Sequence, residues 1–248
     1  MTDTILKVEN LYKSFDKKEI LKDIDFSIEK GQVVALLGPS GSGKSTLLRC
    51  LNGLENIDSG SIFFEGENVD LKEKTWEKLR PEIGMVFQSY DLFPNKTVLE
   101  NLLIGPVKVQ KRNKSDVERN ALKWLERVGL KDKSDSYPNQ LSGGQKQRVA
   151  IVRSLCMEPK LMLFDEVTAS LDPEMVKEVL ELILELAKTD KTLLIVTHEM
   201  SFAHKVSDRV IFMADGEIIE SSSTSKFFKN PKTQRAQDFL QSLDYINL

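Results

Sequence analysis

Residues 32–52 constrain the fold of this chain most strongly, because an apolar run, a glycine-rich loop and a helical pattern follow one another there. Residues 32–37 read QVVALL, which is typical of a strand covered on both faces of a parallel sheet. Residues 38–46 read GPSGSGKST, and residues 45–52 have the pattern of a helix. A strand that passes through glycines into a helix predicts a parallel α/β core with this loop beside the sheet.

The loop has the composition of a phosphate-binding site. Its glycines at positions 38, 41 and 43 let backbone N–H groups turn inward, because a Cβ atom would block the wrap. The following helix adds the partial positive charge of its N-terminus. Lys44 can reach the β- and γ-phosphates of a nucleotide, and the hydroxyl of Ser45 can bind Mg²⁺. The predicted nucleotide-binding residues of the loop are Gly38, Pro39, Ser40, Gly41, Ser42, Gly43, Lys44, Ser45 and Thr46.

A glycine-rich turn with an incidental lysine is the alternative interpretation of this loop, and the flanking strand and helix disfavour it.

Two carboxylates follow another apolar run, in the sequence LMLFDE at 161–166. Open α/β sheets bind ligands at the carboxyl edge of their strands. We therefore expect Asp165 to hold Mg²⁺ through its waters and Glu166 to orient or deprotonate the attacking water. Paired carboxylates after a strand often only begin a solvated helix, but the phosphate loop favours the catalytic interpretation.

Two further polar residues each follow an apolar strand candidate. Gln88 ends the strand predicted at 83–87, where its side chain could contact Mg²⁺ or the attacking water. His198 ends the strand predicted at 192–197, where its imidazole could contact the γ-phosphate. A lone glutamine or histidine at such a place is more often structural. Both residues are functional candidates only because the phosphate loop and the other motifs occur in the same chain.

The sequence LSGGQ at 141–145 predicts a second anion-binding end in the same chain. Ser142, Gly143 and Gly144 precede a helical pattern at 145–155, so a serine hydroxyl and exposed N–H groups would meet at a helix start. One nucleotide needs both phosphate-binding ends. The economical arrangement is a head-to-tail pair with two-fold symmetry, in which each LSGGQ covers the nucleotide of its partner. This predicts a homodimer with the nucleotide sandwiched at the interface.

A helical lobe is predicted inside the α/β core. Residues 89–154 carry little strand signal, and residues 113–130 have helical spacing of their apolar positions. Ser115 and Glu118 have the spacing of a capping box, and Gly129 is placed to end that helix.

The remaining segments complete the predicted organisation of one domain over 1–248. The core lobe takes residues 1–88 and 155–220, and a short tail takes 221–248. Asp215-Gly216 between two apolar stretches is a strong hairpin signal. Strict alternation at 24–28 predicts a half-buried strand.

Composition excludes several other classes of protein. The net charge of −3 argues against a broad basic surface for nucleic acid. Cys50 and Cys156 stand in apolar stretches without partners at metal-ligand spacing, which favours buried free thiols in a reducing compartment. The chain shows neither a secretion signal nor an apolar run long enough to cross a bilayer. We therefore expect a cytoplasmic chain whose membrane role would need a partner.

Taken together, GPSGSGKST, Gln88, LSGGQ, LMLFDE, ASLD at 169–172 and His198 resemble the nucleotide-binding subunit of ABC transporters. The resemblance implies ATP and Mg²⁺ as ligands and an α/β fold: a P-loop NTPase core with a parallel sheet, an N-terminal antiparallel β subdomain and an inserted α-helical subdomain. It implies that Phe15 stacks on the adenine, with Tyr12 as the second candidate. It also implies that Gln145 of LSGGQ lies at the nucleotide and that Gln88 senses Mg²⁺ and the membrane partner. Asp172 would carry signals across the dimer.

Finer features resemble the importers of polar amino acids within that family. They are KSTLLRCLNGLE at 44–55, GMVFQSYDLFPNKTVLEN at 84–101, the Gly105-Pro106-Val107 step and a short tail without room for a regulatory domain. The resemblance implies integral membrane permease subunits, an extracytoplasmic amino-acid-binding protein, and a peripheral position on the inner face of the cell membrane. One departure is Val167 where the family has proline, and it puts the turnover rate in question.

Other functions fit the same motifs less well. An export, lipoprotein-release or cell-division ATPase of the family is disfavoured by the residues between Gln88 and Gly105, on resemblance alone. A soluble ATP-driven switch on DNA would carry coiled-coil heptads, and one on ribosomes would carry tandem ATPase units, whereas this chain has one phosphate loop. A P-loop kinase or motor would lack LSGGQ.

Overall fold

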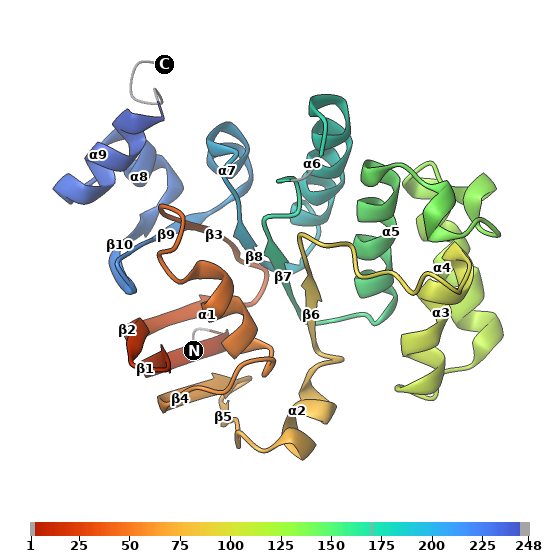
Figure 1. Ribbon diagram of the computed structural model, residues 1–248, viewed down its shortest axis with the longest axis horizontal. Helices are drawn as coiled ribbons and strands as arrows, with labels where there is room; N and C mark the ends of the chain where they lie inside the picture. Colours follow the sequence, from red (N-terminus) through yellow and green to blue (C-terminus); the bar gives the residue numbers. More distant parts are fainter. Residues whose placement is uncertain (1–2, 170, 244–248) are drawn as a thin grey trace. The chain divides into compact units, whose positions relative to one another are not determined.

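The computed structural model describes residues 3–169 and 171–243 of the 248 residues (Figure 1). Contacts within the chain divide it into two compact units. Unit 1 combines the stretch that ends at Arg80 with the stretch that begins at Ala187, and unit 2 is Pro81–Leu186. Ser170, within the ASLD sequence, lies outside the described residues.

An antiparallel sheet begins unit 1, as predicted for the N-terminal part of the chain. Its strands β1 (Thr4–Phe15), β2 (Lys18–Glu29), β4 (Ser59–Phe64) and β5 (Glu67–Asn68) have the spatial order β2-β1-β4-β5. The predicted alternation in β2 is confirmed, because Ile24, Phe26 and Ile28 are buried between more exposed neighbours. Side chains from alternate positions therefore form the buried face of this sheet.

The parallel strands of unit 1 lie around β3 (Val33–Leu37), whose residues are all buried. Strand β8 (Thr192–Val196) pairs parallel with β3 on one side, and β9 (Arg209–Ala214) pairs parallel with it on the other. The predicted hairpin is confirmed, since β10 (Glu217–Ser223) returns antiparallel to β9. Asp215 and Gly216 have φ of 54° and 86°, as a tight two-residue turn requires.

The helices of unit 1 are short. They are α1 (Lys44–Leu51), α2 (Glu73–Leu79), α7 (Met200–Val206), α8 (Thr224–Lys229) and α9 (Gln234–Ser242). Helix α1 follows the glycine-rich loop directly, as predicted. The C-terminal helices α8 and α9 place Phe227 and Leu240 in one buried cluster with Phe212 of β9, so hydrophobic burial fixes them to the sheet.

Unit 2 pairs two parallel strands and groups three longer helices. Residue Ile83 of β6 (Ile83–Val86) is in register with Leu161 of β7 (Leu161–Asp165). Figure 1 shows the helices α3 (Val98–Lys108), α4 (Lys114–Arg127) and α5 (Gly143–Cys156) grouped together, and α3 contacts both α4 and α5. The unit also contains 3₁₀ turns at Lys131–Lys133 and Pro138–Gln140 and most of α6 (Pro173–Ala187). Among the described residues, every helix is too short or too polar to span a bilayer.

The predicted capping box of Ser115 and Glu118 is wrong. Helix α4 begins at Lys114, and the side chain of Asn113 caps it by accepting a hydrogen bond from the N–H of Ser115 at 2.9 Å. Asn at a helix start bonds its own backbone two residues on, and this takes precedence over the serine further in. Gly129 ends the helix as predicted, with φ of 69°.

Candidate nucleotide-binding site

Two positions in the glycine-rich loop of unit 1 cannot accept a side chain. Gly38 and Gly43 have φ of 151° and 101°, in the region that disfavours side chains. A Cβ atom on Gly38 would lie 2.0 Å from the carbonyl oxygen of Met213, and one on Gly43 would lie 2.8 Å from Cδ2 of Leu21. Gly41, with φ of 79°, has no atom of the described part of the chain within 4 Å of its Cβ position, apart from its own neighbours in sequence. The loop is therefore packed against β9 and β2 on one side and open at Gly41.

Lys44 lies across this loop. Its side chain is buried, with a relative exposure of 4%, and its Nζ donates hydrogen bonds to the carbonyl oxygens of Gly38 at 3.0 Å and Pro39 at 2.9 Å. The buried hydroxyl of Ser42 has no hydrogen-bond partner among the described residues. A buried polar atom without a partner, an ammonium group and a helix start at one loop are suited to the oxygens of an anion. The residues present therefore fit the phosphates of a nucleotide.

The end of the β1–β2 hairpin presents an aromatic ring in the same unit. Phe15 is the last residue of β1 and is 43% exposed. Tyr12 is half-buried, and its pKa is raised, first by burial and then by the charge of Asp23. The packing of Gly43 against Leu21 places this hairpin beside the loop. Phe15 is thus the more available ring, although its contact with adenine stays a prediction.

His198 follows a strand that is paired with the strand before the glycine-rich loop. It follows β8, which pairs with β3 through Leu36 and Val196, and its side chain is exposed. Parallel strands have their carboxyl ends at one edge. Gly38 and His198, which follow β3 and β8, therefore lie at the same edge of the unit 1 sheet.

In unit 2, Asp165 and Gln88 share an edge in the same way. Strands β6 and β7 are parallel, with Val86 in register with Phe164. Asp165 is buried, at 6% exposure, whereas Gln88 is exposed. One carboxylate with hydroxyl and amide oxygens suits Mg²⁺, which keeps several waters in protein sites. Within the described residues no group of three or more His, Cys, Asp or Glu side chains forms a metal cage.

Glu166 occupies a strained turn directly after β7. Its φ is 47°, and its carbonyl oxygen accepts a hydrogen bond from the N–H of Ala169 at 3.0 Å. Val167 inside this turn is buried, at 5% exposure. Asp172 is exposed, and its carbonyl oxygen accepts from the N–H of Val176 at 2.9 Å at the start of α6. The chain therefore turns at Glu166, directly after the end of β7.

The LSGGQ sequence forms the capped start of α5. Ser142 is the N-cap, and its hydroxyl accepts from the N–H of Gln145 at 3.3 Å, while the Gln145 side chain accepts from the N–H of Ser142 at 2.9 Å. Gly143 and Gly144 form the first turn. Gln145 thus has a capping role, and its predicted contact with nucleotide stays a prediction.

Met175 is a residue at this helix start that the sequence did not single out. The N–H of Gly144 donates to Sδ of Met175 at 3.2 Å, and a Cβ atom on Gly144 would lie 2.8 Å from Cβ of Met175. Nothing in the spacing of Met175 signals this contact, because it joins residues that are far apart in the chain. Glycine is required at position 144 by the approach of α6.

The two units thus carry complementary parts of the predicted site. Unit 1 carries the phosphate loop, Phe15 and His198, and unit 2 carries Gln88, the carboxylates and LSGGQ. That these parts form one site stays a prediction. The fold and the phosphate loop define the protein as a P-loop ATPase.

The comparisons with known proteins give its family. The family model described as ABC transporter matches residues 21–169. A shorter match, at 137–203, is to a model described as AAA domain, putative AbiEii toxin, Type IV TA system. The arginine transport ATP-binding protein ArtM of Bacillus subtilis is 54% identical over 239 residues, covering 96% of this chain and 100% of that protein. The chain therefore belongs to the ABC transporter family. It is an ATP-binding subunit that hydrolyses ATP.

Other relatives and solved structures agree. The L-cystine import ATP-binding protein TcyC of Bacillus subtilis is 53% identical, covering 96% of this chain and 98% of that protein. The glutamate/aspartate import ATP-binding protein GltL of Escherichia coli is 49% identical, covering 96% and 99%. The structure of cbiO1 from Clostridium perfringens has a TM-score of 0.83 at 34% identity, covering 97% of this chain and 95% of that one. A dimeric structure of the cassette MJ0796 bound to ADP and Pi has a TM-score of 0.80 at 32% identity, covering 89% and 99%.

Proposed function

We propose that this chain is the ATP-hydrolysing subunit of an importer of polar or charged amino acids. The observation that carries the proposal is that one chain has both a glycine-rich loop that fits phosphates before α1 and a capped LSGGQ start at α5. Relatives named for transport of arginine, cystine and glutamate/aspartate support the cargo class. One ATPase domain over 1–248, with a core of 1–88 and 155–220, a helical lobe of 89–154 and a tail of 221–248, serves this function.

The loop holds the phosphates of ATP and the adenine stacks on Phe15. Backbone N–H groups of 38–43 and the ammonium of Lys44 surround the phosphates, and binding turns the Lys44 side chain from the loop carbonyls toward them. Ser45, Gln88 and Asp165 hold the Mg²⁺, which neutralises phosphate charge when it is bound.

Hydrolysis uses Glu166 and His198. The carboxylate of Glu166 accepts a proton from a water whose oxygen attacks the γ-phosphorus, and the bond to the bridging oxygen breaks to leave ADP and phosphate. His198 donates a hydrogen bond to the γ-phosphate, which favours the charge that develops there. The left-handed turn at Glu166 holds its carboxylate beyond the strand end for this task.

Two copies complete each site. Ser142, Gly143, Gly144 and Gln145 of one copy cover the ATP on the loop of the partner, and Asp172 carries the signal between copies. Binding of ATP thereby closes the homodimer, and loss of the γ-phosphate opens it. A head-to-tail pair with two-fold symmetry repeats this contact twice.

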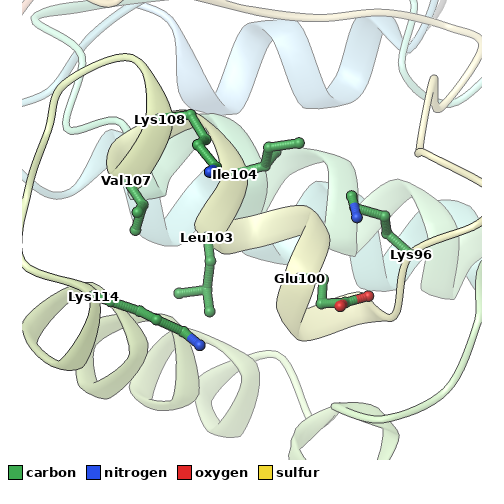
Figure 2. A pocket seen from close by; sticks show the side chains of 7 residues that line it. All are labelled: Lys96, Glu100, Leu103, Ile104, Val107, Lys108 and Lys114. Atoms are coloured by element: carbon green, nitrogen blue, oxygen red, sulfur yellow. The ribbon is translucent and has the colours of Figure 1, made fainter.

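Permease subunits of the membrane receive the motion through Gln88 and the helical lobe. A groove of about 300 Å³ lies on this lobe (Figure 2). Its apolar side chains are Leu103, Ile104 and Val107 of α3, and its charged rim has three lysines and one glutamate, at Lys96, Glu100, Lys108 and Lys114. An apolar permease segment with a carboxylate suits such a groove. The chain acts in the cytoplasm, peripheral on the inner face of the membrane, with an extracytoplasmic binding protein as the source of cargo and no nucleic acid partner.

Co-purification with a candidate permease from the genome that encodes this chain tests both the partner and the cargo. We expect the complex, in lipid discs with its binding protein, to hydrolyse ATP faster with a polar or charged amino acid than without one. The measurement is phosphate release against a panel of amino acids. A complex that every amino acid leaves unstimulated would contradict import of this cargo class.

Matched variants on α3 test the groove in the same preparation. Ile104→Glu places a charge in the groove and should abolish co-purification, whereas Val109→Glu, at a side chain that is 59% exposed outside the groove lining, should retain it. Loss of the complex in both variants, or in neither, would refute the docking surface.

A further inference from the structure

We propose that Lys13 is a positioning residue for the purine base, because its ammonium holds the ring of Phe15 in place from within the hairpin. The inference rests on the proposed stacking of adenine on Phe15 and deepens it. Lys13 is two residues before Phe15 on β1, and its Nζ lies 4.8 Å from the centroid of the Phe15 ring. An ammonium at this distance over an aromatic ring is attracted by the electrons of the ring.

Lys13 differs from an ordinary surface lysine in its burial. Its relative exposure is 9%, whereas Phe15 is 43% exposed. The cation is thus the inner partner and the ring is the outer one. A ring that is held from the inside and open to the outside is suited to stack a flat base on its exposed part.

Asp58 fixes Lys13 and the strand around it. One carboxylate oxygen of Asp58, Oδ1, lies 3.8 Å from Nζ of Lys13, and the other, Oδ2, accepts a hydrogen bond from the N–H of Ser14 at 2.6 Å. The N–H of Asp58 donates to the carbonyl oxygen of Tyr12 at 2.9 Å. These contacts bind both neighbours of Lys13 in the chain, so the ammonium has little freedom to leave the ring.

Lys13 also lies between the hairpin and the helix that begins at the phosphate loop. It pairs with Leu21 of β2, the residue against which Gly43 packs. Burial raises the pKa of the Cys50 thiol in α1 to about 12, and the charge of Lys13 acts on this thiol in the opposite direction. Lys13 therefore lies near α1, the helix that follows the phosphate loop.

Because the ring is already ordered when the base binds, the entropic cost of binding is lower. This gain in affinity applies to the base and not to the phosphates. Removal of the cation should therefore weaken a purine nucleotide about three- to tenfold, the range of a cation–π contact that is largely shielded from water. A ligand that has phosphates without a base should bind as before.

Calorimetric titration with ADP and with inorganic pyrophosphate, both with Mg²⁺, tests this inference. Lys13→Met should weaken ADP about three- to tenfold and leave pyrophosphate unchanged, and Lys13→Arg, which retains the cation, should stay within about twofold of the parent. In a Phe15→Leu background, Lys13→Met should have no further effect on ADP. This loss of additivity separates a contact through the ring from a general structural role.

The same strand offers a matched control. Lys7 lies 5.9 Å from the ring centroid of Phe63, but its side chain is 53% exposed, and the proposed site does not include this pair. Lys7→Met should leave the affinity for ADP unchanged.

The outcomes distinguish this inference from the proposed function. If Phe15→Leu weakens ADP but Lys13→Met does not, the role of Lys13 is overturned and the stacking stands. If Phe15→Leu has no effect, the stacking itself is overturned. If Lys13→Met weakens ADP and pyrophosphate equally, or remains additive with Phe15→Leu, Lys13 acts on the fold or the phosphates and the inference fails.

Discussion

At the residue scale, Glu166 combines a strained backbone with a proposed catalytic role. A left-handed backbone costs a residue with a Cβ atom roughly 1–2 kcal/mol, yet Glu166 has φ of 47°. The hydrogen bond from Ala169 and the burial of Val167 hold the turn in this form. Strain of this kind persists only where the surrounding structure holds it, and it is concentrated at functional sites. The effect of Val167, in place of the family's proline, on the turnover rate stays a prediction.

Glu166→Gln tests the catalytic role at this residue. The amide cannot accept the proton of the attacking water, so ATP should bind while turnover falls at least about a hundredfold. Unhydrolysed ATP should then hold two copies together, and light scattering after gel filtration should report a dimer with ATP and a monomer without nucleotide.

The parent protein is the control, since its ATP-dependent dimer should disappear as ATP is consumed. A Glu166→Gln variant that stays monomeric in saturating ATP would count against closure of two copies around the nucleotide. Retained turnover would count against the assignment of Glu166.

At the scale of elements, helix starts decide several details of unit 2. Thr97 and Ser142 cap α3 and α5 through capping boxes with Glu100 and Gln145, whereas Asn113 alone caps α4. Each cap satisfies N–H groups that have no partner within the helix. The caps thereby fix where the helices of this unit begin, and one of them forms the LSGGQ end.

Asn113→Ala should lower the free energy of unfolding by about 1 kcal/mol, because it removes the acceptor for the N–H of Ser115. Glu118→Ala is the control, and it should change the stability by less than about 0.5 kcal/mol, since Glu118 lies past the start of the helix and does not cap it. Urea denaturation followed by circular dichroism measures both. A larger loss in Glu118→Ala than in Asn113→Ala would restore the capping box predicted from sequence.

At the scale of the whole molecule, the chain has two predicted phosphate-binding ends, and it is similar to a cassette whose solved structure is dimeric. The LSGGQ end is proposed to act on the nucleotide of the partner. Activity should then depend on the protein concentration, because only the pair has a complete site.

Ser142→Ala and Thr97→Ala remove the same kind of cap from α5 and α3 and separate this role from stability. Both should lose about 1 kcal/mol of unfolding free energy. Only Ser142→Ala should reduce turnover, by about tenfold, while the affinity for ATP measured in the monomer stays near that of the parent. Equal turnover in the two variants, or weakened binding in monomeric Ser142→Ala, would mean that Ser142 does not act across the dimer.

The sequence by itself determined the elements that depend on neighbouring residues. The run 32–37, the glycines of the loop and Asp215-Gly216 each encode their own backbone form, and the structure confirms the strand, the loop with its helix, and the hairpin. The LSGGQ start of α5 belongs to the same group. Hydrophobic periodicity, glycines and helix caps depend on residues close together in the sequence, so these elements can be predicted from the sequence alone.

Only the tertiary structure decided which distant residues meet. Asp58 reaches Lys13, and Met175 covers Gly144, through pairings that no local pattern specifies. Helices α8 and α9 add Phe227 and Leu240 to the cluster around β9. These contacts join residues that are far apart in the sequence. The partner of each residue is determined by how the side chains pack and not by the hydrophobic pattern near it.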